Sequence, residues 1–184
     1  MKIEIWSDVA CPWCYIGKRR FETALENFAH KDQVEVHWRS YQLDPSLPEH
    51  YDGTELGYLS ERKGMAPDQV SQMFAHVTAQ AASEGLDYDF ERIVVANSFN
   101  AHQLLHLAAA HGMGDGAKED LLSAHFERGE DIGSREFLVR AGVGLGLDAG
   151  EINQALDTEK YADEVRADFA EARALGITGV PFFV

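Results

Sequence analysis

Two cysteines, Cys11 and Cys14, constrain this chain more than any other feature. They are the only cysteines among its 184 residues, and two residues separate them. The alternating run 1–7 ahead of them predicts a short strand, and residues 15–28 behind them predict a helix. A Cys-x-x-Cys pair at a strand-to-helix junction is the layout of a thiol–disulfide active site.

The predicted helix gives the two cysteines different roles. Cys11 is expected at the helix N-terminus, where unpaired backbone N–H groups and the helix dipole favour a thiolate. Pro12 suits the first helical turn because it has no N–H to leave unsatisfied. We therefore expect a lowered pKa for Cys11, which attacks first, while Cys14 acts as the resolving thiol. Trp13, between them, is expected to be exposed and to contact substrate.

The composition is that of a single domain, or of one domain with a large insertion. With 45% hydrophobic and 26% charged residues, the chain can bury a core. Its formal net charge of −15 argues against nucleic acid and anionic membranes as partners, since both require a basic surface. The strand pattern begins at once, without the charged and apolar regions of a signal peptide, and no apolar run is long enough to span a bilayer. We therefore expect a cytoplasmic protein, where a structural disulfide is rare.

The order of predicted elements places most of the chain in helices. A second strand at 34–39 completes a strand–helix–strand unit. The segment 43–64 is rich in proline, glycine and polar residues and predicts no regular element. From Pro67 onward, helices are predicted over 67–84, 98–111 and 118–128, and then from the N-caps Ser134, Asp148 and Thr158. The final segment 177–184 predicts a turn that enters a strand.

Three segments together resemble one family. They are SDVACPWCYIG at 7–17, NSFNAH at 97–102 and GITGVPFF at 176–183. In this order they resemble DsbA-family oxidoreductases of the FrnE-like type, and the resemblance covers essentially the whole chain. It implies that Pro181 is a cis-proline and that the backbone of Val180 binds substrate beside the cysteine pair.

The resemblance also implies a fold. It is an α/β thioredoxin-like domain built from 1–43 and 175–184, with an all-helical insertion over 44–174 ahead of the cis-proline strand. A thioredoxin fold continues with a hairpin strand and a closing helix, so we expect these two elements to be missing after Val184.

The implied activity is disulfide exchange with protein thiols or disulfides, or with glutathione. It needs neither a metal nor an organic cofactor, and glutathione is a candidate co-substrate. The sequence does not determine whether the protein oxidises, reduces or isomerises disulfides. It does not set the oligomeric state either, and a dimer is one option.

Three alternatives stay open at this point. A metal site would need more ligands, and the helical pair His102 and His106 lacks the glutamate of a metalloprotease motif. A glutathione-dependent isomerase or transferase, of the 2-hydroxychromene-2-carboxylate isomerase or kappa-class type, shares the helical insertion but has serine in place of Cys11. A binding module that is not an enzyme would keep its binding activity in a Cys11→Ser variant. Asp8 is interpreted either as a turn residue or as a group near the thiols that assists proton transfer, and Asn97 is interpreted as a helix cap.

Overall fold

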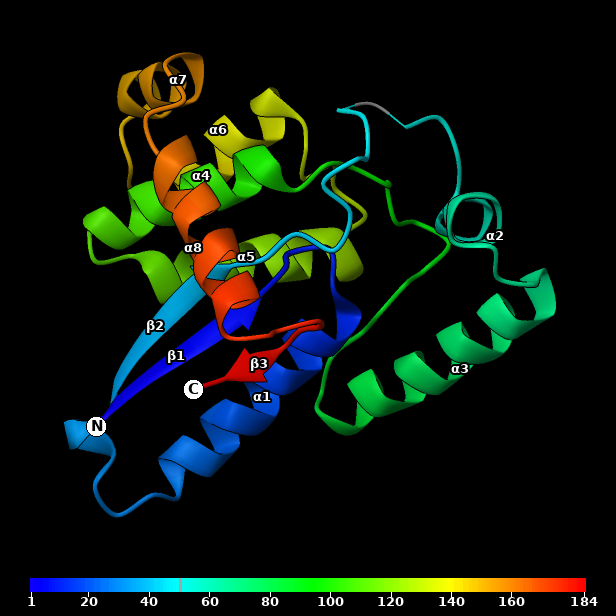
Figure 1. Ribbon diagram of the computed structural model, residues 1–184, viewed down its shortest axis with the longest axis horizontal. Coiled ribbons are helices and arrows are strands. Elements are labelled where there is room, and N and C mark those ends of the chain that lie inside the picture. Colours follow the sequence, from blue (N-terminus) through cyan, green and yellow to red (C-terminus); the bar gives the residue numbers. More distant parts are fainter. Residues whose placement is uncertain (50) are drawn as a thin grey trace.

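A small sheet carries both ends of the chain in the computed structural model, which describes residues 1–49 and 51–184 (Figure 1). Its strand order is β2-β1-β3. The strands are β1 (Lys2–Ser7), β2 (Glu35–Ser40) and β3 (Phe182–Phe183). β1 runs parallel to β2 and antiparallel to β3. Helix α1 (Pro12–Glu26) connects β1 to β2, so the predicted strand–helix–strand unit is confirmed.

The central strand β1 ends in the interior of the molecule. Ile5, Trp6 and Ser7 at its carboxyl end are fully buried, and Ser7 is paired with Ser40 of β2. Because the chain leaves β1 at this point, the residues that follow enter α1 from a buried position. The end of β1 therefore fixes where the cysteine pair lies.

Helices make up most of the remaining chain. They are α2 (Glu55–Lys63), α3 (Pro67–Ser83), α4 (Phe99–Ala110), α5 (Gly114–Phe126), α6 (Arg135–Gly144), α7 (Ala149–Asp157) and α8 (Ala162–Ala174). In Figure 1, α4 to α7 form one group, whereas α2 and α3 lie apart from it on the other side of α1. The largest core cluster contains Leu104, Leu121 and Leu138 of the first group together with Val9 from the loop after β1. The helical insertion and the cysteine loop thus share one core.

The helix caps agree with the sequence at two positions and differ at a third. The side chains of Ser134 and Asp148 accept hydrogen bonds from the backbone N–H of Phe137 and Glu151, as predicted. Thr158 was predicted to begin the last helix, and this prediction was wrong. It is the C-cap of α7, where its hydroxyl donates to the carbonyl of Gln154.

Two further helix boundaries differ from the prediction. α5 begins at Gly114 rather than at residue 118. The low helix propensity of Gly114 and Gly116 hides this first turn in the sequence. α2 lies in the segment predicted to have no element. Its N-cap is Thr54, which accepts from Gly57 N–H, and its C-cap Gly64 adopts a left-handed φ of 69°.

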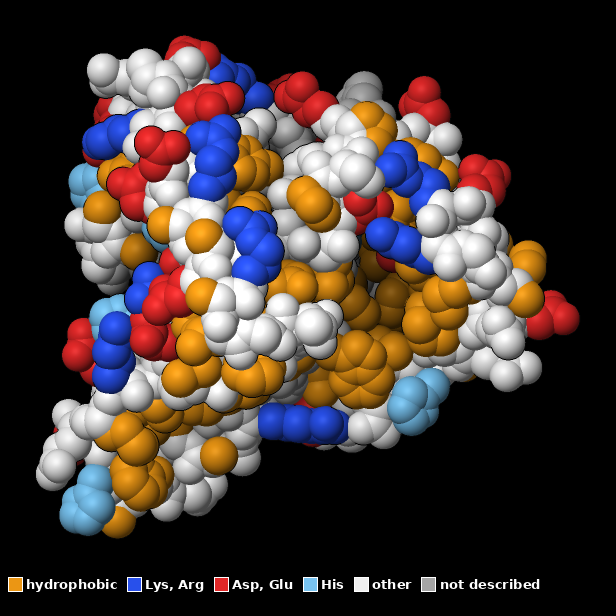
Figure 2. Space-filling view, viewed as in Figure 1, with side chains coloured by type: hydrophobic (Ala, Val, Ile, Leu, Met, Phe, Trp, Pro, Cys, Tyr) orange, Lys and Arg blue, Asp and Glu red, His pale blue; other side chains and the backbone are white. Residues whose placement is uncertain are grey.

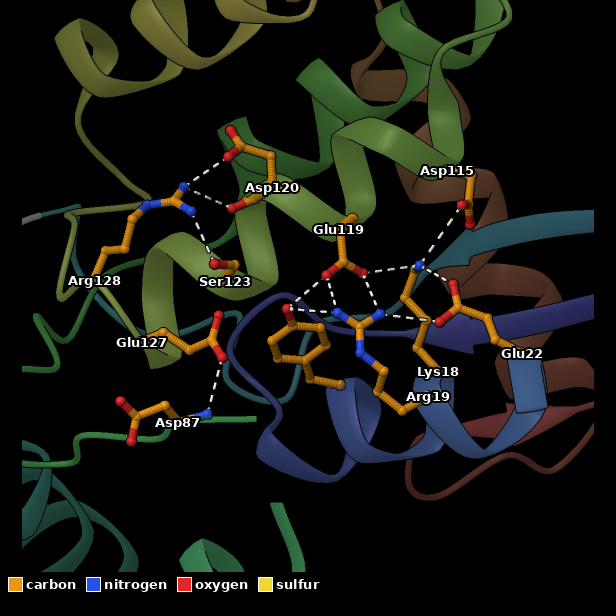
Figure 3. A network of polar contacts seen from close by, with 11 residues as sticks. Lys18, Arg19, Glu22, Asp87, Asp115, Glu119, Asp120, Ser123, Glu127 and Arg128 are labelled. Atoms are coloured by element: carbon orange, nitrogen blue, oxygen red, sulfur yellow. Dashed lines mark hydrogen bonds and ion pairs between the residues drawn. The ribbon is translucent and has the colours of Figure 1, made fainter. Parts of the chain in front are cut away.

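A polar network holds α1 against α5 (Figure 3). Its centre is Glu119 of α5, which accepts a 2.6 Å hydrogen bond from the Tyr15 hydroxyl and forms an ion pair with Arg19. The nearly buried ammonium of Lys18 lies 2.9 Å from the same carboxylate. Burial alone would raise the pKa of Glu119, but these hydrogen bonds lower the pKa to about 2.

We predict that Glu119→Gln destabilises the fold by about 1–3 kcal/mol at pH 7, because two cations lose their shared acceptor charge. Because the pKa of Glu119 is lowered in the folded protein, its ionised carboxylate stabilises the fold at pH values above the ordinary pKa of 4.5. This contribution to the free energy of unfolding is lost as the pH falls towards 2. Urea unfolding at pH 7 and pH 3 should therefore separate variant and wild type more at pH 7. The control is Asp163→Asn, whose side chain is 97% exposed. If the free energy of unfolding of Glu119→Gln differs from that of wild type by the same amount at pH 7 and pH 3, the role given to Glu119 is contradicted.

Candidate active site

The cysteine pair sits at the start of α1. Cys11 is the N-cap residue with an extended backbone, at φ −101° and ψ 112°, and Pro12 follows at the first helical position. Cys14 donates its backbone N–H to the carbonyl of Cys11 at 3.0 Å. Cys11 is 3% exposed and Cys14 is 0% exposed, and both are free thiols.

The loop before β3 meets this pair. The Val180–Pro181 peptide bond is cis. The Cys11 Sγ lies 3.5 Å from the carbonyl oxygen of Val180, although 169 positions separate the two residues. The loop and the cysteine pair therefore form one site. Trp13 is 37% exposed beside it, with its ring centroid 5.9 Å from that of His76.

Gly17, one turn further along α1, allows the loop to approach the helix closely. A Cβ atom at this position would lie 2.8 Å from Cγ of Pro181, closer than van der Waals contact permits. The absence of a side chain at residue 17 therefore sets the position of Pro181.

We predict that Gly17→Val displaces the loop, lowers the stability by about 1–3 kcal/mol through overpacking and slows any reaction that uses Val180. Urea unfolding measures the first effect, and the rate of disulfide exchange measures the second. Gly144→Ala is the matched control, because nothing lies within 4 Å of its added Cβ. If Gly17→Val has the stability and the exchange rate of wild type, the packing of Pro181 on α1 contributes to neither.

Asp8 anchors the loop between β1 and Cys11. Its carboxylate accepts from the backbone N–H of Leu43 at 2.7 Å and of Ala10 at 3.3 Å. It also lies 3.2 Å from Nε2 of His102 in α4, and both side chains are 1% exposed. Burial would raise the pKa of Asp8, but the hydrogen bonds with His102 and Leu43 lower it. Asp8 thus does more than make a turn, because it joins the cysteine loop to the helical insertion.

The two histidines of α4 belong to separate networks. Burial lowers the pKa of His102, whose side chain is 1% exposed. His106 lies 3.2 Å from the carboxylate of Asp168 and 3.1 Å from the hydroxyl of Ser40. Within residues 1–49 and 51–184, no group of three or more histidine, cysteine, aspartate or glutamate side chains is placed to hold a metal ion.

Asn97 has a structural role at the start of α4. Its side-chain oxygen accepts from Phe99 N–H at 2.9 Å and from the amide of Gln42. Its own amide donates to the carbonyl of Leu47 at 2.6 Å. The N-cap of α4 is Ser98 rather than Asn97, which was interpreted as the helix cap. The contacts of Asn97 instead join the first turn of α4 to the segment after β2.

A buried lysine, Lys118, lies beside the carboxyl end of β1, and its position was not predicted from the sequence. Lys118 of α5 is 1% exposed, and its ammonium lies 3.5 Å from the carbonyl oxygen of Ser7 and 5.7 Å from the ring centroid of Trp38. Burial lowers the pKa of this lysine. The sequence did hold a signal for its burial, because Lys118 lies three and four residues before Leu121 and Leu122 on the buried face of α5.

The surroundings of the two thiols shift their pKa values in opposite directions. The hydrogen bond to Cys14 and burial raise the pKa of Cys11. Burial would also raise the pKa of Cys14, but the hydrogen bond from Cys11 and the charge of Lys118 lower it. The expected lowering of the Cys11 pKa was therefore wrong for the reduced pair. The Cys11 side chain makes no cap hydrogen bond to α1 and faces the carbonyl of Val180 instead.

Comparison with known proteins decides the family. The model of the DSBA-like thioredoxin domain matches residues 2–184. The chain belongs to this family. Among solved structures it is similar to a probable DsbA oxidoreductase of Streptomyces coelicolor, SCO1869, with 44% identity and a TM-score of 0.92, over 100% of this chain and 80% of that one.

Two further structures share the fold. The cytosolic disulfide reductase DsbM of Pseudomonas aeruginosa, also solved with GSH, is 19% identical with a TM-score of 0.64, over 100% of this chain and 83% of that one. A 2-hydroxychromene-2-carboxylate isomerase is 14% identical with a TM-score of 0.67, over 100% of this chain and 85% of that one. These matches confirm the predicted family and the α/β thioredoxin-like fold with its helical insertion. The domain boundaries 1–43, 44–174 and 175–184 stay predictions.

No helix within the described ranges 1–49 and 51–184 has both the length and the apolar character needed to cross a bilayer.

Proposed function

We propose that Cys11 and Cys14 form a reversible disulfide, which the protein exchanges with thiols and disulfides of proteins or of small molecules. The observation that carries this proposal is the contact between Cys11 Sγ and the Val180 carbonyl. It sets the first thiol beside the backbone of the cis-proline loop, where a substrate backbone can be held. Membership of the DSBA-like family and the similarity to a probable DsbA oxidoreductase support oxidoreductase chemistry.

In the reducing direction, Cys11 attacks a substrate disulfide. Its proton passes to Cys14 along the hydrogen bond between the two thiols, and one substrate thiolate leaves. Cys14 then loses this proton to solvent and attacks the Cys11 sulfur of the mixed disulfide as a thiolate. The Cys11–Cys14 bond forms, and the second substrate sulfur leaves as a thiolate that takes up a proton from solvent. The substrate gains two electrons and the pair loses two. The oxidising direction is the reverse sequence.

The substrate contacts that we propose are Val180, Pro181 and Trp13. The free backbone edge at Val180 suits an extended peptide that binds by strand addition. Beside the start of α1, Figure 2 shows hydrophobic side chains in a hollow next to α3. In the same region Trp13 contacts His76, and Phe74 stacks on Phe90 with ring centroids 4.2 Å apart. An apolar peptide segment therefore fits this surface better than a charged one.

Glutathione is the small thiol that we propose to reset the pair. The fold neighbour DsbM has been solved with GSH and is described as cytosolic, which supports a glutathione-coupled reaction in the cytoplasm. The electrons come from two thiols, so the reaction requires no metal or organic cofactor.

Turnover of a protein disulfide with glutathione as reductant tests the proposal. Wild type should reduce the disulfide and pass through an oxidised Cys11–Cys14 state, which is detected as two protected thiols. Conversion of an aromatic substrate with glutathione, without any disulfide between the two cysteines, would instead favour the isomerase or transferase alternative.

A further inference from the structure

We propose that Tyr88 is a positioning residue of the disulfide exchange, and that its hydroxyl holds the peptide between the two cysteines in the geometry of the dithiol pair. This role rests on the disulfide exchange proposed above. It gives a part in the reaction to the segment between α3 and α4, which lies outside both the cysteine loop and the cis-proline loop.

The first observation is a direct contact with the backbone between the cysteines. The Tyr88 hydroxyl donates a 2.7 Å hydrogen bond to the carbonyl oxygen of Pro12, across 76 positions of the chain. This carbonyl and the N–H of Trp13 belong to one peptide group, which lies midway between the two cysteines. In a helix that begins at Pro12, the same carbonyl also accepts from the N–H one turn further along. The peptide group that connects the cysteines is thus held from outside the helix as well as from within it.

The second observation is that packing fixes the position of this hydroxyl. Tyr88 is 6% exposed, and its ring stacks on the rings of Phe126 and Tyr15, with centroids 4.9 Å and 6.1 Å apart. Phe90 meets the same ring edge-on, with centroids 6.0 Å apart. Burial raises the pKa of Tyr88, so the hydroxyl keeps its proton and stays a donor. Three aromatic neighbours therefore hold the ring in place while the cysteine pair reacts.

The contact belongs to the reduced pair, since both cysteines are free thiols. In this state the Cys11 sulfur faces the Val180 carbonyl. Formation of the Cys11–Cys14 bond turns this sulfur towards Cys14 and draws together the two ends of the peptide that Tyr88 holds. Because the packed ring does not shift with the peptide, the hydrogen bond to Pro12 weakens in the disulfide. Tyr88 therefore stabilises the dithiol more than the disulfide and makes the oxidised pair a stronger oxidant.

The variant Tyr88→Phe tests this role, because it removes the hydroxyl and keeps the ring. The protein is equilibrated in glutathione buffers, quenched with acid, and its disulfide fraction is measured by thiol labelling. In this equilibrium two glutathione molecules give two electrons and two protons to the pair and become one glutathione disulfide. Tyr88→Phe should shift the equilibrium constant about fivefold towards the protein disulfide, the effect of one hydrogen bond present in only one state. A constant within about twofold of wild type, or a shift towards the dithiol, overturns the role of Tyr88.

The matched control is Tyr58→Phe. Tyr58 of α2 is 8% exposed, and its hydroxyl donates a 2.9 Å hydrogen bond to Asp44 rather than to the cysteine loop. This variant loses a tyrosine hydroxyl of similar burial, and its equilibrium constant with glutathione should stay within about twofold of wild type. An equal shift in both variants overturns the specific role of Tyr88.

Urea unfolding of the two redox forms separates positioning from general stability. Tyr88→Phe should raise the unfolding equilibrium constant of the dithiol form about fivefold more than that of the disulfide form, because the two equilibria are linked. A purely structural contribution would weaken both forms equally, and that result overturns the inference. A wild type that never forms the Cys11–Cys14 disulfide overturns the exchange itself, whereas an unchanged constant beside a wild type that forms it overturns only the role of Tyr88.

Discussion

Replacing Cys11 with serine is expected to abolish disulfide exchange, lowering turnover by at least about 1,000-fold. Cys11 is the thiol that faces the Val180 carbonyl, and a serine hydroxyl in its place cannot form a disulfide with substrate. Turnover of a protein disulfide with glutathione measures the loss. Full activity in this variant would favour a binding module over an enzyme.

The companion variant Cys14→Ser distinguishes the two thiols. It keeps the attacking thiol and removes the resolving one, so it should accumulate a mixed disulfide between Cys11 and substrate. Mass spectrometry under non-reducing conditions detects this adduct. Equal behaviour of Cys11→Ser and Cys14→Ser, with neither forming an adduct, contradicts the order of attack.

The largest expected effect on stability comes from Asp8→Ala, at about 3–5 kcal/mol. The substitution leaves the N–H of Leu43 and the imidazole of His102 buried without their acceptor. Asp8→Asn keeps one acceptor oxygen and should therefore lose less stability than Asp8→Ala. Urea unfolding at pH 7 measures both variants, with the exposed Asp87→Ala as control. A loss below about 1 kcal/mol for Asp8→Ala contradicts the anchoring role.

The same pair of residues sets the direction of the pH dependence. Asp8 and His102 both have lowered pKa values in the folded protein, from ordinary values of 3.8 and 6.5. The unfolded chain therefore binds more protons through both groups, and stability should rise with pH across this range. The part of the rise that comes from Asp8 should be absent in Asp8→Asn, as urea unfolding across this pH range would show.

The parts of the site that the sequence could predict are those set by local pattern or by the family resemblance. The strand–helix junction places Cys11 and Cys14, because a short strand and a proline at the first helical position determine the local backbone. The meeting of Cys11 with Val180 followed from the resemblance, since no local pattern joins residues so far apart.

The parts that the sequence could not predict depend on how helices dock. Asp8 meets His102 only because α4 packs against the loop after β1, and Lys118 contacts the Ser7 carbonyl only because α5 lies against the end of β1. The pKa of Cys11 was predicted from the helix N-terminus alone. Its side chain turns towards Val180 and Cys14, so burial and a neighbouring thiol outweigh the helix dipole.

The most direct test of the redox pair is equilibration of the purified protein in glutathione buffers of increasing oxidation, followed by acid quenching and thiol labelling. The account predicts one transition in which both cysteines lose their label together and the mass falls by two hydrogens. Labelling of both cysteines at every buffer ratio, or a stable glutathione adduct without a Cys11–Cys14 disulfide, would contradict it.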